Sequence, residues 1–576
     1  MATNTTSRKR RSQQRQAGLR IIILLAILVC ANMLASRFHY GFDMTKEQRF
    51  TLSPATKTLL GNMKDVAVVD VYLKGKMPAA FMRMQEAVRD RLQSFKEYAG
   101  GHIIVHYIDP LEGKEEGEKK DIVQQLAEKG VNFLPVSEGD DAQHSEKLVF
   151  PYALVNYKGK SAPVSLLENK VGVTMDEGVS YSESLLEYKF ATAINRLNRA
   201  VAPNIAYIMG HGESLGYNTW YMLQTLARNY KLDTFDLTAS THVPNYYDAI
   251  IINKPTDTFN EKEKFKIDQY VMKGGHVIWC IDMLHTYMDS LQRSSQFITT
   301  DFNLNLDDIL FRYGVRVNAD LIEDLQCNEM PMIMGTDANG QPQIQNRPWM
   351  YLPYFTPSSK HPIVNNMDAV MGVFVNSIDT IANPEIKKTI LLASSKYSRT
   401  TPSPVRVNMS MMLHPPTPEM MNKPYQPVAV LLEGKFHSVF QNRLPASTLH
   451  MLDSIGQPFK GGCDSATSMI VISDGDVFAN NVSPTSGPME MGYWRYTGNV
   501  YANKAFMLNC LEYLTDHSGL LEARSKDHRL RLLDDGRVKA ERKTWQAVNI
   551  GIPIALVLIF ASCYLFFRKR KYERKA

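Results

Sequence analysis

The stretch Asn204-Ile205-Ala206-Tyr207-Ile208-Met209-Gly210-His211-Gly212-Glu213 decides the fold of this chain. Residues 205–209 form an apolar run that predicts a buried strand. The next four residues predict a turn, because glycines on both sides of His211 permit positive φ angles. The spacing of Trp220, Leu223, Ala227 and Tyr230 predicts a helix with these side chains on one face. A strand, a turn and a helix in this order place polar groups at the carboxyl end of a parallel sheet, where ligands of open α/β sheets bind.

The alternation of strands and helices continues beyond this stretch. Apolar runs predict strands at 232–237, 249–253 and 276–281, with an amphipathic helix at 260–272 between the last two. This order favours a doubly wound parallel sheet in a Rossmann-like domain. Two stretches rich in Pro, Met, Asn and Gln are too long for ordinary connections, so we predict inserted surface loops at about 325–362 and 400–427.

A smaller α/β region precedes this domain. Strands are predicted at 66–73 and 103–108 around the helix 79–98, which carries Phe81, Met84, Val88, Leu92 and Phe95 on one face. A hairpin follows, with its turn at Lys158-Gly159-Lys160. The order of elements is similar to that of a thioredoxin-like domain, with Pro135 where that fold often carries a cis proline. The redox dithiol of that fold is missing, so we interpret the region as structural or binding.

Both ends of the chain carry membrane signals. Arg8-Lys9-Arg10-Arg11 precede an apolar segment, and Arg568-Lys569-Arg570-Lys571 follow another that is long enough to cross a bilayer. Because basic residues stay on the cytoplasmic side, both termini are predicted inside and the body outside the inner membrane. The first segment is interpreted as an uncleaved anchor, with a cleaved signal peptide as the alternative.

These signals give a membrane-anchored α/β protein flanked by two transmembrane helices. The predicted parts are a cytoplasmic basic tail (1–20), a transmembrane helix (21–37), a thioredoxin-like periplasmic domain (45–175), a Rossmann-like periplasmic domain (180–520), a membrane-proximal segment (521–547), a transmembrane helix (548–567) and a second basic tail (568–576).

Composition excludes several function classes. The hydrophobic fraction of 44% and charged fraction of 22% are those of a folded protein. The net charge of +6 lies mostly at the ends, so no nucleic-acid partner is predicted. A phosphate-binding loop of the Gly-x-x-x-x-Gly-Lys-Ser/Thr type is missing, so the chain cannot supply an ATPase. No metal-ligand spacing exists among the cysteines, and no cofactor is predicted; Cys280, Cys327, Cys463 and Cys510 are interpreted as buried thiols, with a disulfide as the alternative.

Two short segments are candidate sites. His211 and Glu213, with Gly210 and Gly212, either cap the turn and the next helix, bind a ligand, or act as a general acid–base pair. We favour the capping role and assign no catalytic residue. Asp474 and Asp476 in Asp-Gly-Asp are weak candidates for a divalent cation, because two acids in a glycine turn more often face solvent.

Short motifs along nearly the whole chain also carry a family resemblance. They lie at 45–53, 210–213, 259–275, 429–436, 471–476, 501–510 and 530–534. In this order they resemble the GldG family, the auxiliary membrane component of the ABC transporter linked to gliding motility in the Bacteroidetes. The resemblance implies a non-enzymatic partner of a multi-span permease and a cytoplasmic ATPase. It also implies that the central domain looks like the class I glutamine amidotransferase fold. That chemistry needs a Cys nucleophile at a strand–helix elbow, and here His211 occupies the turn while Cys280 lies inside a strand.

We therefore expect a non-catalytic auxiliary subunit that couples the permease and the ATPase to a periplasmic event, in gliding motility or envelope export. A homodimer within the complex is a further expectation. One alternative is a periplasmic carbohydrate- or peptide-binding receptor that uses the sheet edge near His211 and Glu213, and another is a hydrolase that uses the same pair.

Overall fold

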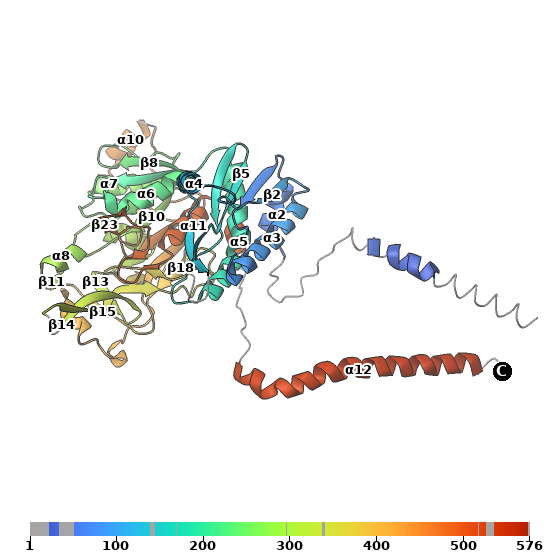
Figure 1. Cartoon of the computed structure of the whole chain (residues 1–576). Coiled ribbons are helices and arrows are strands. Elements are labelled where there is room, and N and C mark those ends of the chain that lie inside the picture. The colour runs from blue at the N-terminus through green and yellow to red at the C-terminus, as the bar shows by residue number, and fades with distance from the viewer. Residues whose placement is uncertain are drawn as a thin grey trace, which may run out of the picture. The chain divides into compact units, whose positions relative to one another are not determined.

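The structure, a computed structural model, divides the chain into two compact units, Met1–Lys526 and Asp527–Ala576 (Figure 1). It describes residues 22–30, 32–33, 51–75, 77–138, 145–168, 170–294, 296–336, 340–454, 456–516, 518–525 and 535–573. The first unit contains all the strands that the structure describes, and the second contains one long helix.

The amino-terminal part of the first unit is built on a four-stranded sheet with the order β2-β1-β5-β6. β1 and β2 are parallel, and β5 is antiparallel to both β1 and β6. Its elements are α2 (Pro54–Gly61), β1 (Ala67–Val71), α3 (Ala79–Tyr98), β2 (Ile103–Tyr107), α4 (Glu116–Glu128), β5 (Tyr152–Tyr157), β6 (Lys160–Ser165) and α5 (Met175–Asn198), with a separate ribbon of β3 (Leu134–Glu138) and β4 (Ser145–Val149).

The helices of this part follow the sequence pattern closely. α3 has the predicted bounds. All five residues of its predicted apolar face are buried in the hydrophobic core that α3 shares with the four-stranded sheet. The Ser53 hydroxyl caps α2 by accepting a hydrogen bond from the Thr56 amide at 3.2 Å. The expectation for Pro135 was wrong, because the one cis peptide bond in the described part of the chain precedes Pro404. Pro135 lies instead in the β3–β4 ribbon.

The larger sheet has seven strands in the order β18-β21-β22-β10-β9-β7-β8. The strands from β22 to β8 are parallel, as predicted, but β21 and β18 add antiparallel pairs at one edge. A helix joins β7 to β8 and another joins β9 to β10, but among the described residues no helix separates β8 from β9 and no α-helix separates β18 from β21. The bounds are β7 (Asn204–Met209), β8 (Lys231–Asp236), β9 (Ala249–Asn253), β10 (His276–Cys280), β18 (Ile386–Ala393), β21 (Pro427–Gly434) and β22 (Thr467–Ile472).

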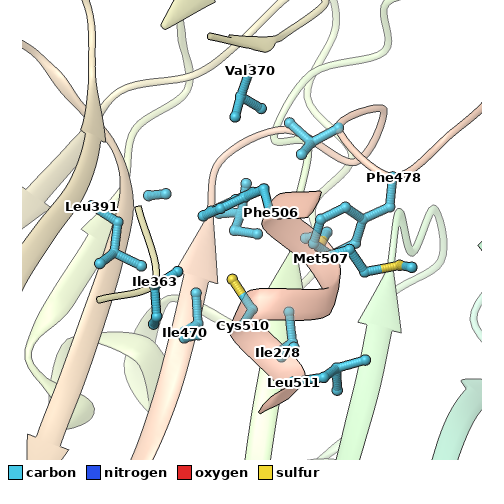
Figure 2. Close-up of a cluster of buried hydrophobic side chains, with 14 of the residues drawn as sticks. Ile278, Ile363, Val370, Leu391, Ile470, Phe478, Phe506, Met507, Cys510 and Leu511 are labelled. Carbon is cyan, nitrogen blue, oxygen red and sulfur yellow. The ribbon is translucent and has the colours of Figure 1, made fainter. Parts of the chain in front are cut away.

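Helices cover both faces of this sheet, so its central strands β7, β9 and β10 are buried over nearly their whole length. α11 (Asn503–Thr515) and α6 (Tyr217–Asn229) lie on one face, and α7 (Glu261–Met272) and α9 (Asp307–Tyr313) lie on the other. Figure 2 shows Cys510 and Leu511 of α11 beside Ile278 of β10 and Ile470 of β22. Neighbouring residues Val277 and Trp279 point into the opposite core, as the two-residue repeat of a strand requires.

The predicted inner face of α6 was wrong by about one position. Its buried side chains are those of Thr219, Met222, Thr225 and Leu226. Trp220 is 43% exposed, and Tyr230 is the C-cap residue rather than part of the helix. Met222 and Leu226 lie four residues apart and form the apolar row that meets the sheet, whereas Leu223 is only half-buried at its margin.

The predicted insertion at about 325–362 is mostly β-strand, whereas the one at about 400–427 holds short strand segments and 3-10 helices. β14 (Cys327–Thr336) and β15 (Pro342–Phe355) form a long hairpin, and Figure 1 shows it at the end of the unit far from α2 and α3. Trp349, Tyr351 and Phe374 stack edge to face in a core of this region, which explains why it is ordered. Richness in Pro, Met, Asn and Gln pointed to a loop here, but paired strands carry these residues. The other short elements are α8 (Met288–Arg293), β11 (Gln296–Ile298), β12 (Val315–Val317), β13 (Asp320–Asp324), β16 (Val370–Met371), β17 (Ile378–Thr380), β19 (Ser398–Pro402), β20 (Arg406–Asn408), η1 (Met409–Met412), η2 (Pro418–Met420), α10 (Ala446–Ser454), β23 (Val482–Ser483), β24 (Gly487–Pro488), β25 (Tyr493–Trp494), β26 (Asn499–Val500) and η3 (Leu520–Ser525).

The second unit is the helix α12 (Asp535–Glu573). Within the described residues, its segment Glu541–Arg570 is the one helix long and apolar enough to cross a membrane. Of the first predicted span, residues 22–30 and 32–33 are helical, and the other positions of 21–37 lie outside the described residues.

Candidate functional site

The turn after β7 lies where the order of the sheet reverses. The chain passes from β7 to β8 on one side and from β9 to β10 on the other, and the crevice between β7 and β9 is where such sheets bind ligands. Here the crevice is closed by the protein itself. The carbonyl oxygen of His211 accepts hydrogen bonds from the amides of Thr256, at 2.7 Å, and Asp257, at 3.0 Å, in the loop after β9.

Gly212 is required at this contact. Its φ angle is +84°, and a β-carbon added to it would lie 1.9 Å from the Thr256 hydroxyl oxygen. We expect Gly212→Ala to lower the free energy of unfolding by about 2–3 kcal/mol, because the new methyl group must push the two loops apart. Urea denaturation of the full-length chain in detergent measures this loss. Gly117→Ala, at an exposed position of α4 with open space around it, is the control and should be neutral or slightly stabilising. An equal loss in both variants would contradict this account.

His211 is buried and held on three sides. Its Nε2 donates a hydrogen bond to Glu263 at 3.0 Å, and its ring stacks on Phe259 with centroids 3.7 Å apart. Glu263 also accepts from the amide of Asn260 at 2.8 Å, which completes the capping box at the start of α7. The imidazole therefore connects the turn after β7 to the amino terminus of α7, on the other side of the crevice.

Glu213 folds back on the same turn. Its carboxylate accepts a hydrogen bond from the His211 amide at 2.7 Å, and its other oxygen lies 3.9 Å from His211 Nδ1. Neither of the two atoms of this second contact has a hydrogen-bond partner among the described residues. Burial raises the pKa of Glu213, whereas at Glu263 the same effect of burial is outweighed by the hydrogen bonds from His211 and Asn260, which lower the pKa.

The structure brings His211 and Glu213 together, but not as a cap of α6. The first residue of that helix is Tyr217, and its Gly216 amide is bonded to the Ser214 hydroxyl. The side chain of His211 is 2% exposed and that of Glu213 is fully buried, so a ligand above the sheet edge would not touch either group. The arrangement fastens two loops and one helix, which is a structural use of residues that the sequence marked as a ligand site.

A second polar group lies at the carboxyl ends of β9, β10 and β22. The ammonium of Lys254 contacts Asp476 at 2.6 Å and Asp282 at 3.2 Å. Asp282 accepts from the Gly475 amide at 2.6 Å, and Asp474 accepts from the Val373 amide at 2.8 Å. The four charged side chains thus join three neighbouring strands to the insertion that contains Val373.

The charges in this group depend on one another. Burial, together with repulsion from Asp282 and Asp476, raises the pKa of Asp474 well above its usual range, and burial also raises the pKa of Asp282. Burial lowers the pKa of Lys254, but attraction by Asp476 and Asp282 raises it more. The lysine ammonium already lies among the carboxylates that the sequence offered to a divalent cation. No group of three or more potential metal ligands occurs in the described part of the chain.

Lys254 and Asp282 were not among the sequence candidates. Lys254 directly follows the buried strand β9, and Asp282 follows the buried strand β10 after Ile281, at the edge where ligands are expected. Their position just after a strand could have identified both residues as site candidates from the sequence, although they belong to no recognised motif. The backbone of Lys254 has φ +52°, and its side chain crosses Gly475, where any β-carbon would lie 2.6 Å from the Lys254 β-carbon.

Comparison with known proteins identifies the family. Residues 202–510, more than half of the chain, match the model of a family described as an ABC-type uncharacterized transport system. The chain belongs to this family. Residues 46–156 match a second model, a domain of unknown function. No curated protein matches the chain.

Two solved structures resemble this ABC transport protein weakly. The N-terminal domain of mmIFT52 is 14% identical, with a TM-score of 0.29, over 54% of this chain and 97% of that one. The exo-β-1,4-mannosidase Op5Man5 from Opitutaceae bacterium strain TAV5 is 9% identical, with a TM-score of 0.18, over 74% of this chain and 51% of that one. Neither likeness is close enough to carry an argument about function.

Both polar groups lie inside the ABC transport region, between residues 202 and 510. Its four cysteines outside the predicted spans are free thiols, of which Cys280, Cys463 and Cys510 are buried. Burial raises the pKa of Cys280 and Cys510, which keeps these thiols protonated and unreactive. Family membership indicates an accessory role in an ABC transport system.

Proposed function

We propose that this protein is a non-catalytic auxiliary subunit that joins an ABC permease and its cytoplasmic ATPase to a domain outside the inner membrane. The family match carries the proposal, because it covers the seven-stranded sheet and both polar groups. The gliding-motility complex of the GldG type is the setting we favour, with envelope export as the broader possibility.

The helix α12 supports membrane attachment. Its apolar segment is followed by Arg568, Lys569 and Arg570, and Trp545 lies near the opposite end, where aromatic side chains favour the interface. Residues 8–11, ahead of the first apolar segment, are also basic, as are the residues that follow the apolar segment of α12. We infer that both termini are cytoplasmic and that the first unit is periplasmic.

The domain assignments follow from strand order. The order β2-β1-β5-β6, with one parallel and two antiparallel pairs, supports a thioredoxin-like domain. The reversal between β7 and β9 supports a Rossmann-like, doubly wound domain of the amidotransferase-like type. We keep the boundaries 45–175 and 180–520 as a proposal, together with a homodimer in the complex.

We also propose that the protein catalyses no reaction. The candidate groups at the sheet edge are engaged with one another, and Cys280 lies within β10 rather than at an exposed elbow. The receptor alternative would need a ligand site above the closed crevice between β7 and β9. Burial of His211 and Glu213 favours the auxiliary role over that alternative.

Affinity purification of the full-length chain in mild detergent tests the proposal. We expect a multi-span permease and an ABC ATPase to co-purify. Replacing residues 548–567 by an unrelated apolar helix of the same length should keep the chain in the membrane but reduce both partners by about tenfold or more, because van der Waals packing between helices is specific to their surfaces. His211→Ala is the control, and it should retain both partners if its role is structural. Recovery of neither partner with the native chain would contradict the proposal.

A further inference from the structure

Two adjoining hollows lie between the amino-terminal sheet and α11. One has a volume of about 320 Å³ and the other about 210 Å³. They share Ser165, Glu168, Tyr188, Lys189 and Leu508, so they meet at the ion pair between Glu168 and Lys189, which are 2.6 Å apart. The larger hollow has the size of a small-molecule site. It is separate from both polar groups at the edge of the seven-stranded sheet.

Charged side chains of both signs line the walls. The two hollows are lined by five cations, Lys189, Arg196, Arg199, Lys504 and Arg524, and by four carboxylates, Glu168, Asp368, Glu490 and Glu512. Burial raises the pKa of Asp368 and Glu512, which favours their neutral forms. By number, the cations of the two hollows exceed the carboxylates by one.

Arg524 is one of two of these cations, with Arg196, that have no carboxylate partner among the described residues, and it is the one that lines the larger hollow. It is 5% exposed, and its guanidinium donates only to neutral oxygens: Asn509 at 3.2 Å and the carbonyls of Asn366 at 3.2 Å and Asn365 at 3.5 Å. Within the described residues, no carboxylate lies within 4.0 Å of it. Its charge lies over the ring of Tyr188, 5.2 Å from the centroid. A buried guanidinium without an anion is unfavourable, and a carboxylate or phosphate would match its planar donors.

We propose that these hollows bind a small anion that carries carboxylate or phosphate groups, with Arg524 as its central contact and Lys504 as a second. Lys504 lies at the rim, 3.1 Å from Glu490, and its side chain is 39% exposed. The tyrosines of the wall, among them Tyr152, Tyr181 and Tyr501, supply hydroxyl groups and apolar ring surface for the rest of the ligand.

Arg524 lies in a segment that leads to the membrane helix, so anion binding there could be transmitted to that helix. Arg524 belongs to η3, whose Leu520 lies in the core of the amino-terminal part and whose Leu521 and Ala523 lie in the core under α11. The chain then continues in sequence to α12. Anion binding is independent of the transport role, whereas its transmission to the membrane helix rests on that proposed function.

Calorimetric titration of the full-length chain in neutral detergent tests this site, with citrate, inorganic phosphate and glycerol phosphate as probes and maltose as the neutral control. We expect saturable binding of at least one anion. Arg524→Gln should weaken it by about tenfold or more and Lys504→Gln by a smaller factor, because each removes a charge-assisted hydrogen bond. Arg443→Gln is the control, since this exposed arginine pairs with Asp308 away from the hollows, and it should bind as the native chain does.

The outcomes separate the ligand sources. Preference for glycerol phosphate would assign the site to a phospholipid headgroup, and preference for citrate or phosphate to a soluble anion; both support the proposal. Binding of none of the anions, binding of maltose alone, or equal affinity in all three variants would overturn it. If Arg524→Gln does not fold, Lys504→Gln at the rim decides. These results do not depend on recovery of a permease, so failure here and failure of the proposed function are distinguishable.

Discussion

Replacement of Lys254 by Met is expected to lower the free energy of unfolding by about 3 kcal/mol, since it leaves buried carboxylates without their cation. Lys254 is the one ammonium in contact with Asp282 and Asp476 within the described residues. The methionine side chain keeps most of the volume, so the loss reports charge rather than packing. Urea denaturation in detergent, followed by tryptophan fluorescence, measures it.

The pH dependence identifies the cause. Burial raises the folded-state pKa of Asp282 and Asp474, so the folded chain binds protons more readily than the unfolded chain. Attraction by Lys254 lowers the pKa of Asp282 in the native chain, so its loss should raise the folded-state pKa further in the variant. Stability of the variant relative to the native chain should therefore rise as pH falls, with a smaller deficit at about pH 5 than at about pH 8. Asp282→Asn in the Lys254→Met background should recover part of the loss. Lys387→Met, at an exposed pair with Glu433, is the control and should cost less than about 1 kcal/mol. A pH-independent deficit would show that the cluster is held by packing instead.

His211→Ala is expected to cost about 3 kcal/mol, because it opens a cavity beside Phe259 and removes the hydrogen-bond donor of the buried Glu263. The folded-state pKa of Glu263 is lowered, so its share of stability is complete above its unfolded pKa of about 4.3 and is lost as pH falls through the folded value. The variant should lose this acid dependence along with the stability. Unfolding curves measured at several pH values below about 5 reveal both effects.

A matched histidine distinguishes structure from function. His437 pairs with Glu385 at the surface, where its side chain is 41% exposed, and His437→Ala should cost less than about 1 kcal/mol. If His211→Ala folds with native stability but abolishes a transport phenotype, the group at the turn acts on a ligand, and the structural interpretation is wrong.

The spacing of apolar residues along the sequence predicted helices and strands that bury apolar side chains in a hydrophobic core. The α3 stripe and the buried strand β7 follow directly from apolar spacing, and the order of strands and helices indicated the parallel part of the sheet. The sequence also indicated positive φ angles at the glycines on both sides of His211, and Gly210 and Gly212 have them.

Non-local pairing was beyond the sequence. Ile322 of β13 opposes Thr400, which lies 78 residues later in a stretch that composition marked as loop. Glu263, which fixes His211, lies 52 residues away and looks like an ordinary helix-capping residue. Lys254 and Asp282 became a group only because β9 and β10 are adjacent in the sheet. Such contacts form only when the chain folds, so no regular spacing of residues in the sequence predicts them.

The central claim is that α12 contacts the permease within the membrane. Photo-cross-linking in intact cells tests it, with a photoreactive amino acid placed in turn at Leu556, Val557, Leu558 and Ile559, which together face every side of the helix. We predict that at least one of these positions yields a covalent adduct with a multi-span permease. Adducts with lipid alone at all four positions would contradict the account.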